Sequence, residues 1–367
     1  MPVGGGETSW ALSAVRFPFA MRAVHRLDVW NLRPALRHQQ WVRLKMKAIV
    51  LTRYGGPDVL ELRDVPTPAP TANQVLVRVH AASLNDWDWE MLRGQSLVTR
   101  LLHGLFRPKV HIIGCDIAGR VAAVGEQVKT LRVGDEVYGD LCMRGFSAFA
   151  EYACAPEACL AYKPASMTFE QAAAIPQAGM LAVQGLIDVG RIRQGQKVLL
   201  NGAGGGVGTF GLQIAKLHNA EVTAVDKAEK LDMLRALGAD CVIDYRREDF
   251  TRNGKSYDLI LDVKTNRSPF AYARALSPHG TYATVGGDIP RLLQTATLGP
   301  LISRLSSKRV RVVGLKPNKD LPYINQLFEA GKLVPVIDKQ YKLADISHAF
   351  RRFGAADHKG KIVINVM

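Results

Sequence analysis

The feature that most constrains the fold of this chain is a glycine-rich turn between two apolar segments of different periodicity. Residues 198–200 form a short apolar run with strand character, and residues 207–217 carry apolar side chains at helical spacing. A strand, a glycine turn and a helix in this order form a dinucleotide site, because glycines let backbone N–H groups approach a pyrophosphate at the positive end of the helix. An ordinary glycine-rich loop is the weaker alternative. We therefore predict a dinucleotide site made by Ala203, Gly204, Gly205, Gly206, Val207 and Gly208.

The length and composition are those of a globular chain with two domains. The 367 residues suffice for two cores, and 47% hydrophobic with 22% charged residues is ordinary. No run of about eighteen apolar residues occurs, so a membrane span is not expected. The cysteines are scattered without a Cys-x-x-Cys pair, which indicates a reducing compartment rather than a disulfide framework or a zinc knuckle. They are Cys115, Cys142, Cys154, Cys159 and Cys241.

The chain is strongly basic, with a formal net charge of +15 at pH 7. Residues 1–45 carry seven basic and two acidic side chains and lack clear periodicity. We predict that they form a flexible basic extension outside the fold, and both a transit peptide and an early start codon would explain it. A basic surface attracts nucleic acid, anionic membranes or phosphorylated cofactors. No basic–aromatic module accompanies the charge, so a solvated basic surface is favoured and a nucleic-acid partner is not expected.

Three stretches of different texture follow the extension. Residues 46–167 read as short strands separated by Gly, Pro and Asp turns, with a more helical stretch at residues 87–106. Residues 168–314 alternate strands with helices, which indicates a parallel sheet. Residues 315–367 return to strands and turns. We predict an α/β chain in which a β-rich domain, residues 46–167 and 315–367, is interrupted by a dinucleotide-binding domain, residues 168–314.

Motifs along this region resemble the zinc-free quinone oxidoreductase branch of the medium-chain dehydrogenase/reductase superfamily. The matching stretches are residues 47–62, 82–89, 114–125, 133–139, 172–186 and 360–366, together with the glycine turn. The resemblance implies a GroES-like β-barrel domain interrupted by a Rossmann-type doubly wound parallel sheet. It also implies that the active site lies in the cleft between the two domains.

The same resemblance bears on a catalytic metal. Zinc-dependent relatives place ligands at the positions of Asn85, Cys115 and Gln177, and their four-cysteine structural zinc lobe is missing here. A catalytic zinc needs three N, S or O ligands and one open position. Cys115 and Asp116 could bind a metal, but Asn85 and Gln177 are poor ligands. We therefore predict no zinc, with Cys115 as a small buried hydrophobic residue.

Without a Lewis acid, reduction of an already activated acceptor is the accessible chemistry. Hydride adds to an electrophilic carbon of a quinone or an α,β-unsaturated carbonyl, and the charge delocalises onto oxygen. The resemblance places Asn85 near the nicotinamide, where its amide would donate to the developing oxyanion. A turn-stabilising role is the structural alternative for Asn85. No general acid is evident; water is the favoured proton source, and His103 is a weaker candidate.

Two signals conflict over which dinucleotide is used. Asp226 ends the strand after the glycine turn, where an acidic side chain binds a ribose 2′-hydroxyl and repels a 2′-phosphate, which favours NADH. Lys230 and Tyr245 match family positions that contact the 2′-phosphate of NADPH, and Lys227 lies beside them. Gly286, near the end of a predicted strand, is a further cofactor contact. We predict NAD(P)H, with a lean to NADPH.

Other functions remain open on the sequence. One alternative is a reductase or dehydrogenase of other carbonyl substrates. Another is a cofactor-binding interaction or RNA-binding protein with little turnover, which the basic charge permits. We expect a small-molecule substrate, a homodimer as a family habit, and a cytoplasmic location, or an organellar one if residues 1–45 act as a transit peptide.

Overall fold

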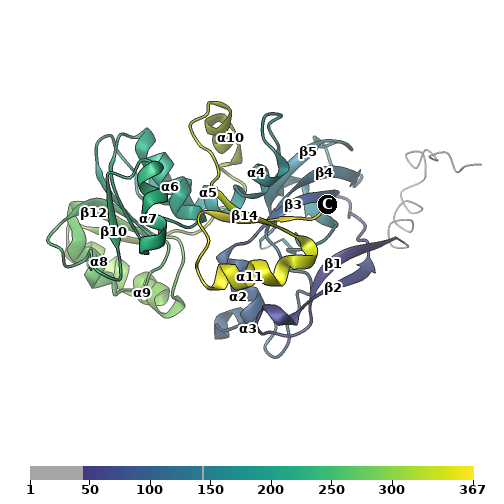
Figure 1. Ribbon diagram of the computed structural model, residues 1–367, viewed down its shortest axis with the longest axis horizontal. Coiled ribbons are helices and arrows are strands. Elements are labelled where there is room, and N and C mark those ends of the chain that lie inside the picture. The colour runs from purple at the N-terminus through teal and green to yellow at the C-terminus, as the bar shows by residue number, and fades with distance from the viewer. Residues whose placement is uncertain (1–43, 143) are drawn as a thin grey trace, which may run out of the picture.

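Two kinds of strand pattern divide this chain, and the structure places them in two domains that lie side by side (Figure 1). The computed structural model describes residues 44–142 and 144–367. The expectations for residues 1–43 therefore lie outside the described residues. None of the helices in the described ranges is long and apolar enough to cross a membrane.

The first domain is built from short, mostly antiparallel strands. β1 (Lys45–Leu51) pairs with β2 (Leu60–Pro66) along its whole length, across a turn that contains Gly55 and Gly56. A larger sheet has the order β14-β15-β3-β4-β5-β7, with β6 paired to β3. Its strands are β3 (Gln74–Ser83), β4 (Asp116–Val124), β5 (Glu136–Asp140), β6 (Tyr152–Pro156), β7 (Ala161–Tyr162), β14 (Ile337–Lys342) and β15 (Lys361–Asn365).

The helical stretch expected at residues 87–106 forms two helices, α2 (Asp86–Arg93) and α3 (Leu97–His103). They are separate because Gly94 adopts a left-handed conformation with φ 54°, which ends α2, and Ser96 caps α3 by accepting the N–H of Val98. The remaining helices of this domain and of the junction are α4 (Phe169–Ala173), α5 (Pro176–Val183), α10 (Leu321–Glu329) and α11 (Ile346–Gly354).

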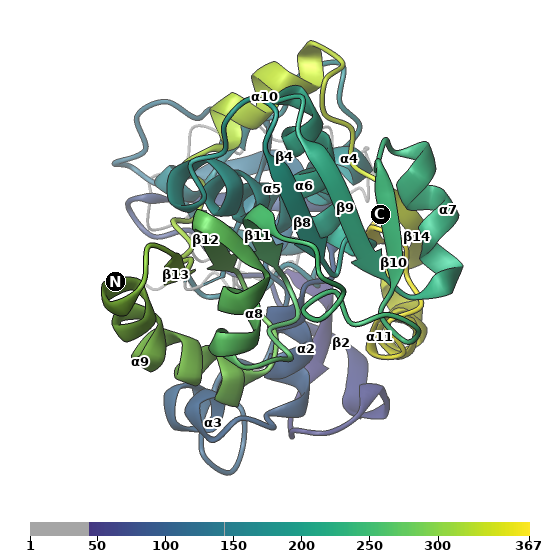
Figure 2. The ribbon, with the colours of Figure 1, turned by 90° about the vertical axis from the view of Figure 1, so that its left-hand side faces the viewer.

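The second domain contains a six-stranded parallel sheet in the order β10-β9-β8-β11-β12-β13, which Figure 2 views from this end of the molecule. The strands are β8 (Lys197–Asn201), β9 (Glu221–Asp226), β10 (Cys241–Asp244), β11 (Tyr257–Asp262), β12 (Leu276–Thr284) and β13 (Arg309–Val312). The helices are α6 (Gly206–Leu217), α7 (Ala228–Ala236), α8 (Pro269–Ala275) and α9 (Ile289–Leu305).

Both faces of this parallel sheet are buried, which explains why its strands read as continuous apolar runs. Val198 and Leu200 of β8 face a core shared with α5 and α6, whereas Leu199 between them packs with Tyr272 of α8 and Ile302 of α9. The alternation is the two-residue period of a strand. The parallel sheet with helices on both sides, joined to a β-rich domain, confirms the predicted fold class.

The chain returns to the first domain after the parallel sheet. β13 ends at Val312 and β14 begins at Ile337, so the predicted boundary at residues 314/315 falls between them. β15 then pairs with β3, a strand from the other end of the chain. The start of β15 also contacts the glycine turn, because the N–H of Gly360 donates to the carbonyl of Gly204 at 2.9 Å. This contact joins the two domains at the predicted cofactor site.

Candidate active site at the domain junction

The carboxyl ends of the parallel strands lie at one edge of the sheet, which is where ligands bind in this class of fold. β8, β9, β11 and β12 place Asn201, Asp226, Asp262 and Thr284 there. Asp262 is fully buried and accepts hydrogen bonds from the Asn201 amide (2.7 Å) and the Tyr282 hydroxyl (2.8 Å). These bonds hold neighbouring strand ends in register beside the glycine turn.

Three glycines of the turn lie close against neighbouring atoms, and at Gly208 those atoms are backbone. A Cβ at Gly208 would stand 2.4 Å from the backbone of Ala203, so only glycine lets α6 pack this close to the end of β8. A Cβ at Gly204 would stand 2.5 Å from the Lys230 side chain. One at Gly206 would stand 2.6 Å from the side chain of Lys361, which comes from the other domain. The turn is thus fitted to side chains from both domains.

The N-terminus of α6 is suited to hold an anion. Gly205 is its N-cap residue and supplies no side chain to accept the first N–H groups of the helix. Gly205 and Gly206 are only partly buried, whereas the rest of the turn is buried. The first-turn N–H groups and the positive end of the helix dipole would hold a pyrophosphate. The residues present therefore fit a dinucleotide.

Asp226 is turned toward the glycine turn rather than away from it. Its carboxylate accepts the N–H of Gly204 at 2.8 Å and the N–H of Lys227 at 2.9 Å, and the residue is 7% exposed. Lys230 lies 3.8 Å from the same carboxylate. One oxygen therefore stabilises the glycine turn and the other the start of α7, a role that the sequence did not indicate.

Basic side chains gather around Asp226 on the predicted 2′-phosphate side. Lys230 is 4% exposed, and burial lowers its pKa, with Asp226 offsetting part of the shift and Lys264 and Lys227 adding to it. Lys227 forms an ion pair with Asp357 of the other domain at 2.5 Å. Lys230 and Lys227 are thus paired with different carboxylates, Asp226 on the parallel-sheet side and Asp357 of the other domain.

Tyr245 and Gly286 also lie at the carboxyl edge of the sheet. The N–H of Tyr245 donates to the carbonyl of Asp226 at 3.2 Å, and its ring is exposed with the guanidinium of Arg246 above it at 5.9 Å. The carbonyl of Gly286 accepts from the Thr284 hydroxyl at 3.2 Å, directly after β12. Arg246 is a further cation here that the sequence reasoning missed.

Asn85 lies in a buried polar network at the start of α2. Its Nδ2 donates to Asp116 at 2.9 Å, and its Oδ1 accepts from the ammonium of Lys361 at 2.5 Å. This amide orientation follows from its neighbours, since the oxygen must face the cation and the nitrogen the carboxylate. The backbone N–H of Asn85 donates to Asp88, which sets the start of the helix. The second amide hydrogen of Asn85 has no acceptor among the described residues.

Lys361 is the functional candidate that the sequence reasoning missed. It opens β15, is 3% exposed, and donates to the carbonyl of Leu84 (3.0 Å), to Asn85 and to Asp116 (3.3 Å). Its stem passes beside Gly206 of the glycine turn. Residues 360–366 were recognised as a motif, but only as a strand. A lysine directly before the apolar run Ile362–Ile364 was the available signal.

Asp116 receives four hydrogen bonds although it is fully buried. Besides Asn85 and Lys361, it accepts the hydroxyl of Ser83 at 3.0 Å and the backbone N–H of Gln177 at 3.1 Å. A buried carboxylate is tolerated only when it is paired and hydrogen-bonded in this way. The ammonium of Lys361 supplies the positive charge at this point.

The three positions of the zinc ligands in related enzymes do not fit a catalytic zinc here. Both polar atoms of the Asn85 side chain are committed to Asp116 and Lys361. Burial raises the pKa of the Cys115 thiol well above its usual value, so the neutral thiol is favoured unless a cation stabilises the thiolate. Gln177 offers only an amide.

Within the described ranges, one group of side chains has metal-like spacing. The ligand atoms of Cys115, Asp140 and Cys142 lie within 4.8 Å of one another, and all three residues are buried. Only Cys115 belongs to the zinc positions considered above. Burial, with Asp116 nearby, raises the pKa of Asp140 to about 7. The raised pKa values of Cys115 and Asp140 favour the neutral form of these two groups.

His103 is placed as a packing residue. Its ring makes edge contacts with Trp87 (6.0 Å between centroids) and Phe146 (5.9 Å), and burial lowers its pKa. A lowered pKa leaves the imidazole neutral at pH 7, which disfavours it as a proton donor.

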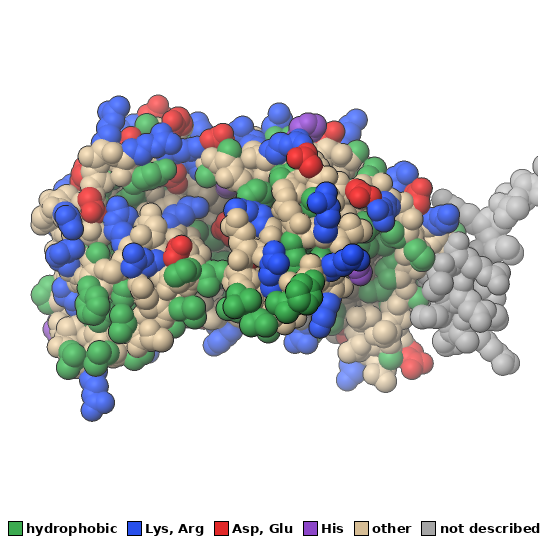
Figure 3. All heavy atoms as spheres, turned by 90° about the horizontal axis from the view of Figure 1, so that it is seen from below, with side chains coloured by type: hydrophobic (Ala, Val, Ile, Leu, Met, Phe, Trp, Pro, Cys, Tyr) green, Lys and Arg blue, Asp and Glu red, His purple; other side chains and the backbone are tan. Residues whose placement is uncertain are grey.

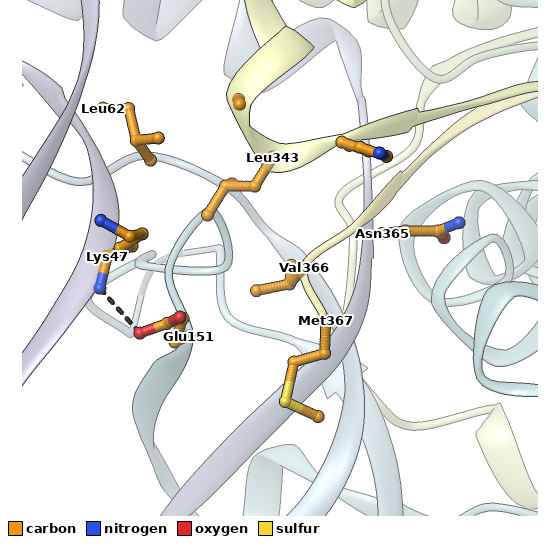
Figure 4. Close-up of a pocket in the computed structure, with 9 residues that line it drawn as sticks. Lys47, Leu62, Glu151, Leu343, Asn365, Val366 and Met367 are labelled. Carbon is orange, nitrogen blue, oxygen red and sulfur yellow. Dashed lines mark hydrogen bonds between the residues drawn. The ribbon is translucent and has the colours of Figure 1, made fainter.

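A surface pocket shown in Figure 4 is distinct from this site. It lies between β1, β2 and the C-terminal strand and is lined by side chains that include Lys47, Leu62, Glu151 and Met367. None of its lining residues belongs to the glycine turn or to the Asn85 network. The candidate site is therefore defined by the convergence of these two groups, not by this pocket.

Comparisons with known proteins agree with this architecture. Residues 71–165 match the alcohol dehydrogenase GroES-like domain, and residues 237–364 match a family described as zinc-binding dehydrogenase. The structure of the quinone oxidoreductase from Coxiella burnetii superposes with a TM-score of 0.79 and 29% identity, covering 88% of this chain and 100% of that one. The fold is thus that of a two-domain dehydrogenase or reductase.

Two curated relatives cover most of the chain. The quinone-oxidoreductase QR1, chloroplastic, of Triphysaria versicolor is 30% identical over 87% of this chain and 98% of its own length. The NADPH-dependent alkenal/one oxidoreductase, chloroplastic, of Arabidopsis thaliana is 31% identical over 87% of this chain and 79% of its own length. The chain belongs to the medium-chain dehydrogenase/reductase superfamily, in the branch that contains the quinone oxidoreductases.

Proposed function

We propose that this protein is an NAD(P)H-dependent reductase of quinones or other α,β-unsaturated carbonyls, and that it works without zinc. The observation that carries the proposal is the Asn85–Lys361–Asp116 network, which touches the glycine turn through Lys361. The names of relatives support the substrate class: one is a quinone oxidoreductase and another an alkenal/one oxidoreductase.

The glycine turn and the lysines bind and orient the nucleotide. A bound NAD(P)H supplies the hydride. The N–H groups at the start of α6 hold its pyrophosphate, and the cations at Lys227, Lys230 and Arg246 surround the ribose of the adenosine. The buried ammonium of Lys230 has only the 3.8 Å ion pair with Asp226 among the described residues and no hydrogen bond, which supports a 2′-phosphate ligand and hence the lean to NADPH.

Asn85 is the residue that we propose to stabilise the acceptor. Its free amide hydrogen donates to the acceptor oxygen, on which negative charge develops as the carbon is reduced. The Lys361 ammonium bound to Oδ1 polarises the amide and strengthens this donor. Lys361 keeps its own protons, because all three face acceptors. The proton that completes the reduction comes from water.

One assay tests this proposal most directly. Oxidation of NADPH and NADH is followed in parallel with a panel of quinones and enones, for the wild type and for Asn85→Ala. We expect Asn85→Ala to lower kcat by roughly 10²-fold with nucleotide affinity unchanged, which is typical for loss of one oxyanion donor. Asn73→Ala, at an exposed position, is the matched control. If folded, nucleotide-binding protein turned over no acceptor, the reductase proposal would fail.

Zinc independence has its own measurement. We expect less than stoichiometric zinc by elemental analysis and unchanged turnover after treatment with a chelator. Stoichiometric zinc whose removal abolished turnover would contradict the arrangement derived from Lys361 and Asn85.

The cellular location and the oligomeric state are also part of the proposal. The described cysteines form no disulfide, which supports a reducing compartment such as the cytoplasm, whereas chloroplastic relatives support an organelle with residues 1–45 as a transit peptide. A homodimer is proposed from family habit, and no nucleic-acid partner is proposed. Size-exclusion chromatography with light scattering tests for the homodimer.

A further inference from the structure

The helix α3 and the turn after it expose their apolar side chains instead of burying them. Leu97 and Leu101 are each 65% exposed and Phe106 is 84% exposed, with Leu102 nearly as exposed as the leucines. Thr99 is the buried residue of α3. An amphipathic helix on a protein surface normally turns its leucines inward. This helix is therefore oriented against the usual rule.

The reversed helix is firmly attached to the domain beneath it. The hydroxyl of Tyr54 donates to the carbonyl of Gly104 at 2.8 Å, at the end of α3. Arg100 donates to the carbonyl of Gly94 at 2.6 Å, and its guanidinium lies 5.0 Å above the Tyr54 ring. His103 packs against Trp87 and Phe146. The exposed leucines thus belong to a fixed projection.

Positive charge surrounds this projection. No acidic residue occurs between Glu90 and Asp116, while Arg93, Arg107 and Lys109 all lie in that interval. Arg107 and Lys109 are exposed next to Phe106. The combination of exposed leucine and phenylalanine with a rim of cations is the pattern of helices that lie in a membrane interface.

A second stretch repeats the pattern on the same side of the molecule. Leu305 at the end of α9 is 77% exposed, and no acidic residue occurs between Asp288 and Asp320. α3 and α9 both lie toward the lower side in Figures 1 and 2, and they come from different domains. Figure 3 views this side directly and shows groups of hydrophobic side chains among many Lys and Arg and few Asp and Glu.

We propose that this lower face, formed by residues 97–109 with α9, docks the protein on the surface of a bilayer that contains anionic phospholipids. The apolar side chains enter the boundary between headgroups and acyl chains, and the basic rim pairs with the negative headgroups. A protein partner would need an apolar and acidic face, whereas a bilayer offers both properties over any area. The net charge of +15 favours the same partner. The inference is independent of the proposed reductase activity.

The test is co-sedimentation of the full chain with vesicles of phosphatidylcholine alone or with phosphatidylserine added. We expect binding to the anionic vesicles, weaker binding in high salt, and little binding to the neutral ones. The double variants Leu101→Gln/Phe106→Gln and Arg107→Glu/Lys109→Glu should each lower the fraction bound by at least about tenfold, since they remove the insertion and the charge complementarity separately.

Lys332→Glu/Val334→Gln is the matched control, because both residues are exposed in the segment after α10, on the upper side in Figure 1. It should bind like the wild type. The proposal is overturned if the wild type does not bind anionic vesicles. It is also overturned if both α3 variants bind equally well, because residues 1–45 would then carry the binding. A change from dimer to monomer in Leu101→Gln/Phe106→Gln without loss of vesicle binding would assign the face to a second copy instead.

Discussion

Two buried lysine–carboxylate pairs lie on either side of the glycine turn, and they differ in how completely they are satisfied. Lys361 and Asp116, on the β-barrel side, are 3.3 Å apart, and the ammonium donates to three acceptors. Lys230 and Asp226, on the parallel-sheet side, are 3.8 Å apart, and both carboxylate oxygens of Asp226 are taken by backbone N–H groups.

We propose that this difference separates a charge that supports the site from a charge that binds the cofactor. Lys361 is a fixed cation whose three N–H groups all have acceptors without a ligand. It can therefore orient the Asn85 amide, but it has no N–H group left to bind an anion. Lys230 is a buried cation with an incomplete set of partners, which a phosphate would complete. Burial is similar in the two cases, at 3% and 4% exposed. Hydrogen-bond completeness, not burial, therefore distinguishes the two roles.

The largest effect should follow from breaking the Lys361–Asp116 pair, in which every N–H group of the lysine has an acceptor. Lys361→Met leaves Asp116 charged, buried and without its cation, so the free energy of unfolding should fall by about 3–5 kcal/mol. Turnover should fall by roughly 10²-fold as Asn85 loses its polarising partner. Chemical denaturation and steady-state kinetics measure the two effects. Lys342→Met, at an exposed position of β14, is the control and should stay within about 0.5 kcal/mol.

A second variant keeps this prediction informative if Lys361→Met does not fold. Asp116→Asn/Lys361→Met removes both charges and should recover most of the lost stability without recovering turnover. Recovery of turnover together with stability would show that Lys361 acts only on folding.

Removing Lys230, the cation of the pair with Asp226, should affect nucleotide binding rather than folding. Lys230→Met should weaken NADPH binding by roughly 10- to 100-fold, the range for losing a hydrogen bond to a charged group, and leave NADH almost unchanged. Dissociation constants for the two nucleotides, measured by fluorescence titration, give the ratio. Equal losses for NADPH and NADH would remove Lys230 from the 2′-phosphate site.

The same lysine predicts how NADPH binding depends on pH. Burial lowers the pKa of Lys230 below its usual 10.5, so the ammonium loses its proton earlier on an alkaline titration than an exposed lysine does. NADPH favours the charged form, and its affinity should therefore fall as pH rises through this lowered pKa. NADH binding should lack this component. In the absence of nucleotide, the lowered pKa means that folding favours the neutral form of Lys230. The charged ammonium therefore lowers the free energy of unfolding at neutral pH, and Lys230→Met should not destabilise the protein there.

The smallest effect is expected at Asp226. Asp226→Ser removes a negative charge near the ribose but also removes the acceptor of the Gly204 N–H. We expect the affinity ratio of NADPH to NADH to rise several-fold, with a stability cost of about 1–2 kcal/mol from the lost hydrogen bond. A ratio that did not rise would mean that Asp226 acts only as a support for the glycine turn.

Local patterns predicted most of the framework. The strand–glycine–helix order at residues 198–217, the alternation of strands and helices after residue 168, and the return to strands near the C-terminus all correspond to elements of the structure. These features depend on neighbours in sequence, where periodicity and turn chemistry act directly. The helical stretch after Asn85 was also expected, although its division at Gly94 was not.

The orientation of the functional side chains could not be predicted in the same way. Asp226 was predicted only as a ribose ligand, and the sequence did not indicate that its oxygens accept the N–H groups of Gly204 and Lys227. Asn85 was expected near the nicotinamide, but the partners that set its amide come from β4 and β15. Lys361 lies 245 residues from Asp116 along the chain. No local pattern encodes such a contact.

The sequence by itself determined that this chain has a parallel sheet with a dinucleotide turn inside a β-rich domain, because glycine placement and apolar periodicity are local properties. Tertiary structure alone decided which buried charges have a full set of hydrogen-bond partners. Lys361 reaches Asp116 and Asn85 only because β15 pairs with β3 beside the glycine turn. Lys230 remains short of partners because the backbone N–H groups of Gly204 and Lys227 occupy both oxygens of Asp226. A buried charge takes its role from the groups that folding brings within hydrogen-bond distance.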